Sequence, residues 1–294
     1  DRFILSYCDR ALGVTSAEEQ PVLPKGNNLS LYLLELFTSR VAKVGMTDGI
    51  RQVLQEESDA LRAYYEQAGI LIARPAGETS CRLAISAKGG TNAENHNHND
   101  VGSYAVALGS ETMVGDQGGP NSYPGDYFNG DAPQKYKIKG SFGHPVPVVD
   151  GRTQSSGGKA KGVVLQKEFT NEKDVFSIDY TSAYSTPNLD KLIRTFVYDR
   201  QGEGNFTVGD EFTAKTPIRF ETAITTRADW KILDDTHLLL ATDSEQMIVA
   251  IEASGKVAFT SETIEVNSPA YTRIGIALKN QSKEGYIRLK MYTK

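Results

Sequence analysis

The chain has 294 residues, of which 39% are hydrophobic and 23% are charged, and its formal net charge is −5 at pH 7. This negative charge argues against a general nucleic-acid binder, because such proteins present a basic surface to the phosphates. No run approaches the roughly 18 consecutive apolar residues that a membrane-spanning helix needs. The composition is that of a soluble globular protein, and the length suits one large β domain or two ordinary domains.

The sequence begins at Asp1, without an initiator methionine or an apolar signal region. We therefore expect a mature product or a piece of a longer protein, and no compartment can be read from the sequence. Cys8 and Cys81 are the only cysteines. Two cysteines make neither a disulfide framework nor a metal box, so both are expected to be free thiols.

Residues 1–69 have a helical pattern. A compact apolar run occupies 31–37, and Asp48 can cap a longer helix in which apolar residues recur at helical spacing up to Ala68. Gly69 then suits the end of that helix. Two or three helices with wide apolar faces cannot bury themselves alone, so they must pack against the next domain or against helices outside this chain.

From Ile70 onward the spacing changes to the period of two that is typical of strands. Gly109-Ser110 predicts a hairpin turn between runs at 104–108 and 112–115, and Asp150-Gly151 predicts a second turn. Further strand-like runs lie at 70–74, 81–86, 163–167, 175–180, 192–198, 206–212, 218–225, 238–241, 247–251, 271–278 and 286–292. More than ten strands without intervening helices predict a large antiparallel β-sandwich over residues 70–294.

The polar stretch 95–100, Asn-His-Asn-His-Asn-Asp, has no use inside an apolar core and is expected on a loop or at a sheet end. Imidazoles placed there can bind a metal, move protons or hold a polar ligand. His96 and His98 are two residues apart, so on an extended segment both would point the same way. Either both bind one metal, or one binds the metal while the other faces a substrate.

Three candidate metal ligands follow one another along the chain: His98, Asp116 and His144. In a hairpin that turns at 109–110, the start of the first strand and the end of the second lie at one sheet end, which brings His98 and Asp116 together. Two imidazoles and a carboxylate suit zinc, with a fourth position for water or another group. The competing interpretation is a set of unrelated polar loop residues, because the spacing is not one of the tight zinc signatures.

Lysines alternate at Lys135, Lys137 and Lys139, and we expect them on one face of a strand. Such a face could hold an anionic polymer, or the lysines could protect an edge strand from aggregation. Tyr127 and Tyr136, like Tyr123, lie in the same region and could stack on sugars or pack in the core.

Several motifs together resemble the central signature of the heparinase II/III-like polysaccharide lyases. They are Gly89-Gly90, Asn92, Glu94, the run 96–103, Val114-Gly115-Asp116-Gln117-Gly118, Gly143-His144-Pro145 and Val148-Val149-Asp150-Gly151. The resemblance covers roughly residues 40–230 and is weaker through 194–199 and 210–225. Its most specific part is the His/Asp pattern.

The resemblance implies the end of an incomplete α/α toroid at 1–69, followed by the antiparallel β-sandwich at 70–294, with the substrate between toroid and sandwich. It implies β-elimination on a uronate: a base removes the C5 proton, the C4–O bond breaks, and an unsaturated sugar forms. Because that proton is weakly acidic, the uronate carboxylate must be neutralised by donors or cations.

The resemblance also implies roles for single residues. His96 would be the catalytic residue facing the cleft. A mainly structural zinc would be held by His98, Asp116 and His144. Tyr127 or Tyr136 would line the site. Independently of the resemblance, the spacing of Lys135 and Lys137 makes them candidates for binding an acidic polysaccharide. The localisation implied is periplasmic or secreted.

The family's catalytic tyrosine and its Asn-His pair lie in the toroid, upstream of the histidine motif, yet the 95 residues before His96 contain no histidine. We therefore expect the C-terminal part of a longer lyase, inactive without the missing upstream helices. Pro145 stands where many relatives have asparagine. Two alternatives remain: a non-catalytic, metal-stabilised sandwich that binds glycans or a protein, and a zinc-dependent hydrolase. His237, which has no clustered partners, is expected to be an ordinary surface histidine.

Overall fold

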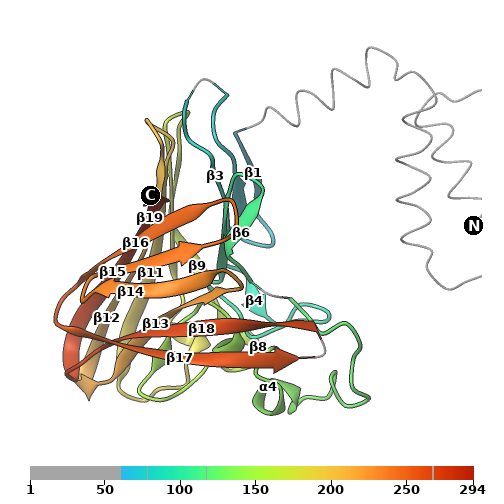
Figure 1. Ribbon diagram of the computed structural model, residues 1–294. Coiled ribbons are helices and arrows are strands. Elements are labelled where there is room, and N and C mark those ends of the chain that lie inside the picture. Colours follow the sequence, from blue (N-terminus) through green and yellow to red (C-terminus); the bar gives the residue numbers. More distant parts are fainter. Residues whose placement is uncertain (1–60, 78, 117, 267) are drawn as a thin grey trace, which may run out of the picture. The chain divides into compact units, whose positions relative to one another are not determined.

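The computed structural model describes residues 61–294 except 78, 117 and 267 (Figure 1). Leu61–Lys294 is one compact unit. The expected helices before residue 61, and Cys8, lie outside the described residues. Cys81 is a buried free thiol, as expected.

The described part is mainly β, and its strand pairings are antiparallel, which confirms the predicted fold class. A five-stranded sheet has the order β1-β2-β3-β5-β6, and a two-stranded sheet pairs β4 with β8. Their bounds are β1 Arg62–Tyr65, β2 Ile70–Ala73, β3 Leu83–Lys88, β4 Thr91–Asn92, β5 Tyr104–Leu108, β6 Glu111–Val114 and β8 Gly157–Lys161.

The largest sheet has eight strands in the order β14-β15-β16-β19-β12-β11-β10-β9, and a four-stranded sheet has the order β17-β18-β13-β7. The eight strands are β14 Asp229–Asp234, β15 His237–Ala241, β16 Gln246–Ala253, β19 Ser282–Thr293, β12 Asn205–Ile218, β11 Leu189–Asp199, β10 Lys173–Asp179 and β9 Val163–Phe169. The four are β17 Val257–Val266, β18 Ser268–Leu278, β13 Phe220–Thr226 and β7 Val148–Val149. Short helical turns are α4 Ala132–Lys135, η1 Ser141–Gly143 and η2 Thr181–Ala183.

The core joins the five-stranded sheet to the eight-stranded sheet through aromatic rings. Phe176, Phe196 and Phe206 come from β10, β11 and β12 and stack with centroid separations of 5.9 and 6.2 Å. Tyr104 of β5 packs its ring against Phe196 and Phe206 at 6.3 and 6.0 Å. Burial of such large apolar side chains from both sheets stabilises the sandwich.

The prediction of a helix through Ala68 is wrong for the described end of that segment. Arg62–Tyr65 is strand β1, paired with β2 through Tyr65↔Ile70. Gly69 has φ +63° and closes the turn between them rather than a helix; a Cβ there would lie 2.8 Å from the Gly90 nitrogen. A short apolar segment fits both periods, and tertiary packing of Tyr64 on the core decides for the strand.

The prediction of a lysine-bearing strand at 134–139 is also wrong. This stretch is the short helix α4 followed by turns. Pro133 near the start of α4 favours a helical turn, because its fixed φ suits that position. Lys135 and Lys137 therefore do not share a strand face.

The two turns predicted from glycine are confirmed. Gly109, with φ +59°, lies in the turn between β5 and β6. Asp150 and Gly151 have φ of +52° and +76°, and the Val149↔Arg152 bridge closes the turn around them. Two successive positive φ values are the geometry that Asp-Gly favours.

Candidate functional site

The polar loop 95–100 is folded back on itself rather than extended. His96 has φ +59°, a left-handed conformation that histidine adopts more readily than most residues. The ring of His98 lies 5.2 Å from that of His144, whereas the ring of His96 lies 4.7 Å from Phe128. Because this segment is not extended, the condition under which both imidazoles would point the same way is not met, and the two histidines have different surroundings.

The carboxamide of Gln154 holds this loop in place. Its Oε1 accepts hydrogen bonds from the Val101 backbone N–H at 3.0 Å and from Asn92 Nδ2 at 2.9 Å, and its Nε2 donates to the Val101 carbonyl at 2.7 Å. Gln154 was not among the predicted residues, because nothing in the sequence pattern indicates hydrogen bonding between positions so far apart. The asparagines take part in the same scaffold: the Asp100 backbone N–H donates to Asn92 Oδ1 at 3.0 Å.

His144 and Asp116 form a direct pair. His144 Nδ1 lies 2.9 Å from Asp116 Oδ1, and Nε2 lies 3.0 Å from the Ile138 carbonyl oxygen. Because a carbonyl can only accept, Nε2 carries a proton and donates it there, so Nδ1 is the atom that faces Asp116. Burial raises the pKa of Asp116, but His144 together with hydrogen bonds such as that from Ser103 outweighs it and holds this pKa below its usual range.

A second acidic group joins this pair. Ligand atoms of Asp100, Asp116 and His144 all lie within 4.8 Å of one another. Asp100 is 7% exposed and forms an ion pair with Lys88. Asp100 was not among the predicted ligands, although its position two residues after His98 in the polar stretch could have suggested it.

His98 lies beside the cluster of Asp100, Asp116 and His144. Its Nε2 lies 3.1 Å from the Tyr127 hydroxyl. Burial, and then the charge of His144, lower the pKa of His98 to about 4, so this imidazole is neutral at pH 7. A neutral imidazole has a free lone pair for a metal.

These donors fit a divalent metal such as zinc. Carboxylate oxygens and imidazole nitrogens are zinc's usual ligands, and three of these groups converge here, with the ring of His98 lying 5.2 Å from that of His144. The donation from His144 Nε2 to the Ile138 carbonyl is the kind of outer contact that orients a metal-binding imidazole.

A groove of about 250 Å³ opens beside this cluster. It is lined by His96, Asn97, Asn99, Phe128, Lys139 and Ser156, together with neighbouring loop residues. The catalytic candidate His96 therefore borders a cavity large enough for a sugar ring.

The four predicted substrate-binding residues do not line this groove. Tyr127 is 1% exposed, and its hydroxyl lies within hydrogen-bonding distance of His98 Nε2. Tyr136 and Lys135 both bond to Asp126. Lys137 forms an exposed ion pair with Glu262 on β17. The third lysine, Lys139, is the one that reaches the groove.

A buried arginine connects the large sheet to the site. Arg194 on β11 donates from Nε and Nη2 to the two carboxylate oxygens of Asp210, each at 2.7 Å. Its Nη1 donates to the carbonyls of Gly102 at 2.7 Å and Pro145 at 2.8 Å. These carbonyls follow Asp100 and His144 closely in sequence, so one guanidinium positions both loops.

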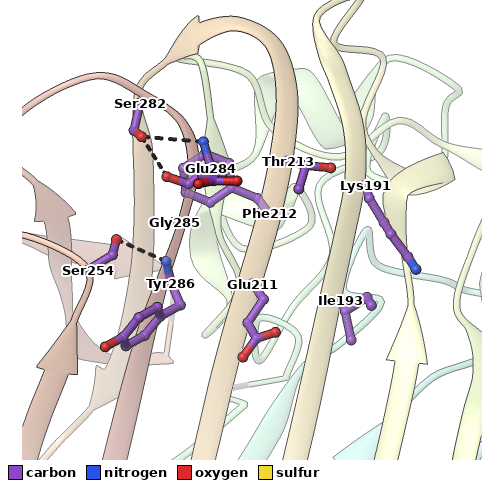
Figure 2. A pocket seen from close by; sticks show the side chains of 10 residues that line it. All are labelled: Lys191, Ile193, Glu211, Phe212, Thr213, Ser254, Ser282, Glu284, Gly285 and Tyr286. Carbon is purple, nitrogen blue, oxygen red and sulfur yellow. Dashed lines mark hydrogen bonds between the residues drawn. The ribbon is translucent and has the colours of Figure 1, made fainter.

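A second hollow lies on the eight-stranded sheet, over β11, β12 and β19 (Figure 2). It has a volume of about 630 Å³ and is lined by side chains that include Lys191, Glu211, Glu284 and Tyr286. It contains no histidine and shares no lining residue with the groove at His96. The side chain of His237, on β15, lies beside its sequence neighbours: Nδ1 is 3.0 Å from Thr236 Oγ1 and 3.0 Å from Asp234 Oδ1.

No family model and no curated protein matches the sequence. Solved structures do match. The heparan sulfate lyase HepC from Pedobacter heparinus has a TM-score of 0.68 at 14% identity, over 90% of this chain and 42% of that one. A heparinase III described as the BT4657 gene product has a TM-score of 0.67 at 10% identity, over 90% and 42% of the two chains. Another heparinase III has a TM-score of 0.61 at 16% identity, over 79% and 36%.

The matching part of the chain has the fold of the corresponding part of heparinase III. The resemblance read from the polar loop thus holds for the architecture, while the identities are too low to transfer activity. The chain spans about two-fifths of the length of the heparinase III structures that it matches. Among the described residues of this heparinase III-like fold, no helix has the length and apolar character to cross a membrane.

Proposed function

We propose that this chain is the C-terminal part of a polysaccharide lyase that cleaves uronate-containing acidic polysaccharide by β-elimination. One observation carries the proposal: His96 borders a groove, while two residues later the ring of His98 lies 5.2 Å from that of His144, which forms a cluster with Asp100 and Asp116. A rigid cluster beside a groove can hold a catalytic loop in a fixed geometry. A parent protein that acts on extracellular polysaccharide would be periplasmic or secreted.

In this proposal a structural zinc is held by His98, Asp116 and His144, with Asp100 as a further candidate. Bound there, zinc would fix the loop and take no part in proton transfer. Its donors come from the polar loop, from the end of the β5–β6 hairpin and from the turn after η1. One ion would therefore join three segments that are distant in sequence.

His96 can hold or move a proton at the reacting carbon or at the leaving oxygen, because its imidazole borders the groove and is not part of the cluster. Among the described tyrosines near the loop, Tyr127 is buried against His98 and Tyr136 bonds to Asp126, while Tyr123 is exposed beside Phe128. In line with the family resemblance, we place the second proton-transfer group in the helical part of the parent protein, outside the described residues, and we propose that the chain alone is inactive.

The test is an ultraviolet assay for the unsaturated uronate product. The parent protein is expected to release it from one of heparan sulfate, heparosan or alginate, and His96→Ala in the parent is expected to lower kcat by at least a hundredfold. The 294-residue chain alone is expected to give no signal. Turnover by this chain alone would show that the catalytic residues have been misplaced.

The alternative, a metal-stabilised sandwich that only binds glycans, is favoured if the parent binds an acidic polysaccharide without releasing product. The exposed rings of Tyr123 and Phe128 beside the groove are compatible with such binding. Saturable binding by an inactive parent would replace the lyase proposal with this one.

A further inference from the structure

Lys139 is a buried cation that has no ion-pair partner among the described residues. Its residue is 6% exposed, and its Nζ donates to the backbone carbonyl of Tyr127. The ammonium lies 4.9 Å from the ring centroids of both Tyr127 and Phe128. No carboxylate forms an ion pair with it among the described residues, whereas Lys135 and Lys137 each have one. A covered charge of this kind is costly unless an anion joins it.

Two buried hydrogen-bond acceptors in the same groove have no hydrogen-bond donor. The Oδ1 atoms of Asn97 and Asn99 are shielded from solvent and have no hydrogen-bond partner. Asn99 is 2% exposed, and its Nδ2 donates to the Gln154 carbonyl at 3.2 Å and to Ser156 Oγ at 3.0 Å. These two bonds fix which end of the amide carries the oxygen. Both asparagines and Lys139 line the groove at His96.

A ligand that satisfies all three groups must combine an anionic group with hydroxyl donors. A neutral sugar would leave the ammonium of Lys139 without a counter-charge. An inorganic anion such as sulfate would leave both amide oxygens without donors. An acidic sugar supplies a carboxylate and hydroxyls on one rigid ring.

We infer that Lys139 determines specificity for acidic sugars by pairing with the carboxylate of a ring bound in the His96 groove, while Asn97 and Asn99 accept hydrogen bonds from its hydroxyls. The inference rests on the proposed function and assigns the charge-neutralising role to one residue. The rings of Tyr127 and Phe128 exclude water from one side of the ammonium, and this strengthens its attraction for a carboxylate. Neutralisation of that carboxylate makes the adjacent C–H easier to deprotonate.

The experiment compares matched ligands and matched lysines on the 294-residue chain. The probes are heparosan and alginate tetrasaccharides, whose only charges are carboxylates, and the same oligosaccharides after carboxyl reduction. Isothermal titration calorimetry is expected to show at least tenfold tighter binding of a uronate form by the wild-type chain. Lys139→Met, which keeps the unbranched apolar stem, is expected to remove this preference. Lys137→Met, which removes a surface lysine nearby, is expected to keep it.

The outcomes separate the inference from the proposal on which it rests. If the wild-type chain prefers the uronate and Lys139→Met keeps that preference, the inference is wrong and the proposed function stands. If the wild-type chain binds neither form of either probe, the inference is wrong, whereas the proposed function is decided separately by release of the unsaturated product from the parent protein.

A second measurement does not depend on folding of a variant. In protein labelled with ¹³C at lysine Cε, the Lys139 resonance is expected to shift on addition of the uronate tetrasaccharide and to stay in place with the reduced form. An unchanged Lys139 resonance under saturating uronate overturns the inference.

Discussion

At the scale of single residues, the polar loop contains two side chains that could complete a metal site with Asp116 and His144. Asp100 has an oxygen within 4.8 Å of ligand atoms of both. His98 places its ring 5.2 Å from that of His144 and is neutral at pH 7, because burial lowers its pKa. Asp100 already has Lys88 as a counter-charge, so we expect His98 to be the stronger ligand.

We predict that purified protein contains one zinc and that chelation lowers its melting temperature. A ligand that binds only the folded state adds about 2.7 kcal/mol at a hundredfold excess over its dissociation constant. His98→Ala and Asp116→Asn should abolish the response to zinc, whereas His96→Ala should keep it. Elemental analysis checks the stoichiometry and thermal melting with and without zinc checks the response. If the purified protein contains no metal and chelator leaves the melting temperature unchanged, the prediction is wrong and the cluster is only a network of polar loop residues.

At the scale of elements, the sequence was most informative where local chemistry fixes the backbone. Glycine at 109 and 151 supplies the positive φ that these turns require. The helix predicted from the spacing of apolar residues was wrong at 62–65, where a short segment fits the periods of helix and strand equally well. The strand predicted at 134–139 was also wrong, because alternating lysines resembled a strand although the segment starts with a helical turn. The candidate metal-binding cluster was partly predictable from residue type, but Gln154 and Arg194 were not, because long-range pairing leaves no local signal.

We predict that Gly151→Ala destabilises the protein by about 1–2 kcal/mol, the usual cost of a left-handed backbone for a residue with a Cβ. The space around Gly151 is open, so φ alone is responsible. Gly130→Ala is the matched control, because Gly130 is equally open but has no positive φ. It should be neutral or slightly stabilising. Urea denaturation measures both, and equal stabilities would refute the conformational explanation.

The buried Arg194–Asp210 pair gives a second prediction about elements. Removing one partner of a buried pair costs about 3–5 kcal/mol, because the other charge remains buried. Arg194→Met should therefore destabilise strongly and should also weaken zinc binding, since the loops of Gly102 and Pro145 lose their donor. Arg288→Met is the control: this exposed arginine pairs with Glu211 and Glu252, and such surface pairs contribute at most about 1 kcal/mol. Denaturation curves and zinc titrations would contradict the prediction if the two variants behaved alike.

At the scale of the whole molecule, the eight-stranded sheet is open at both ends, with β9 and β14 as its edge strands. β9 pairs with β10 on one side and has no strand partner on the other among the described residues. An edge strand with free backbone groups is a template for association with another chain unless charges or bulges protect it. On β9 this protection is partial: Lys167 and Glu168 occupy its second half, while its first half is apolar and uncharged and has a register shift at Leu165.

We therefore predict that the first half of β9 makes the protein prone to self-association at high concentration. Val163, Val164 and Leu165 are 48%, 40% and 51% exposed, and they project on both faces of the strand. Leu165→Lys should lower association without changing the melting temperature, because the side chain it replaces lies in solvent. Tyr123→Lys is the control: Tyr123 is 57% exposed but lies outside any strand, so its loss removes apolar surface without touching the edge. Light scattering over a concentration series measures the effect. If both variants reduce scattering equally, general surface hydrophobicity is responsible and the open edge is not.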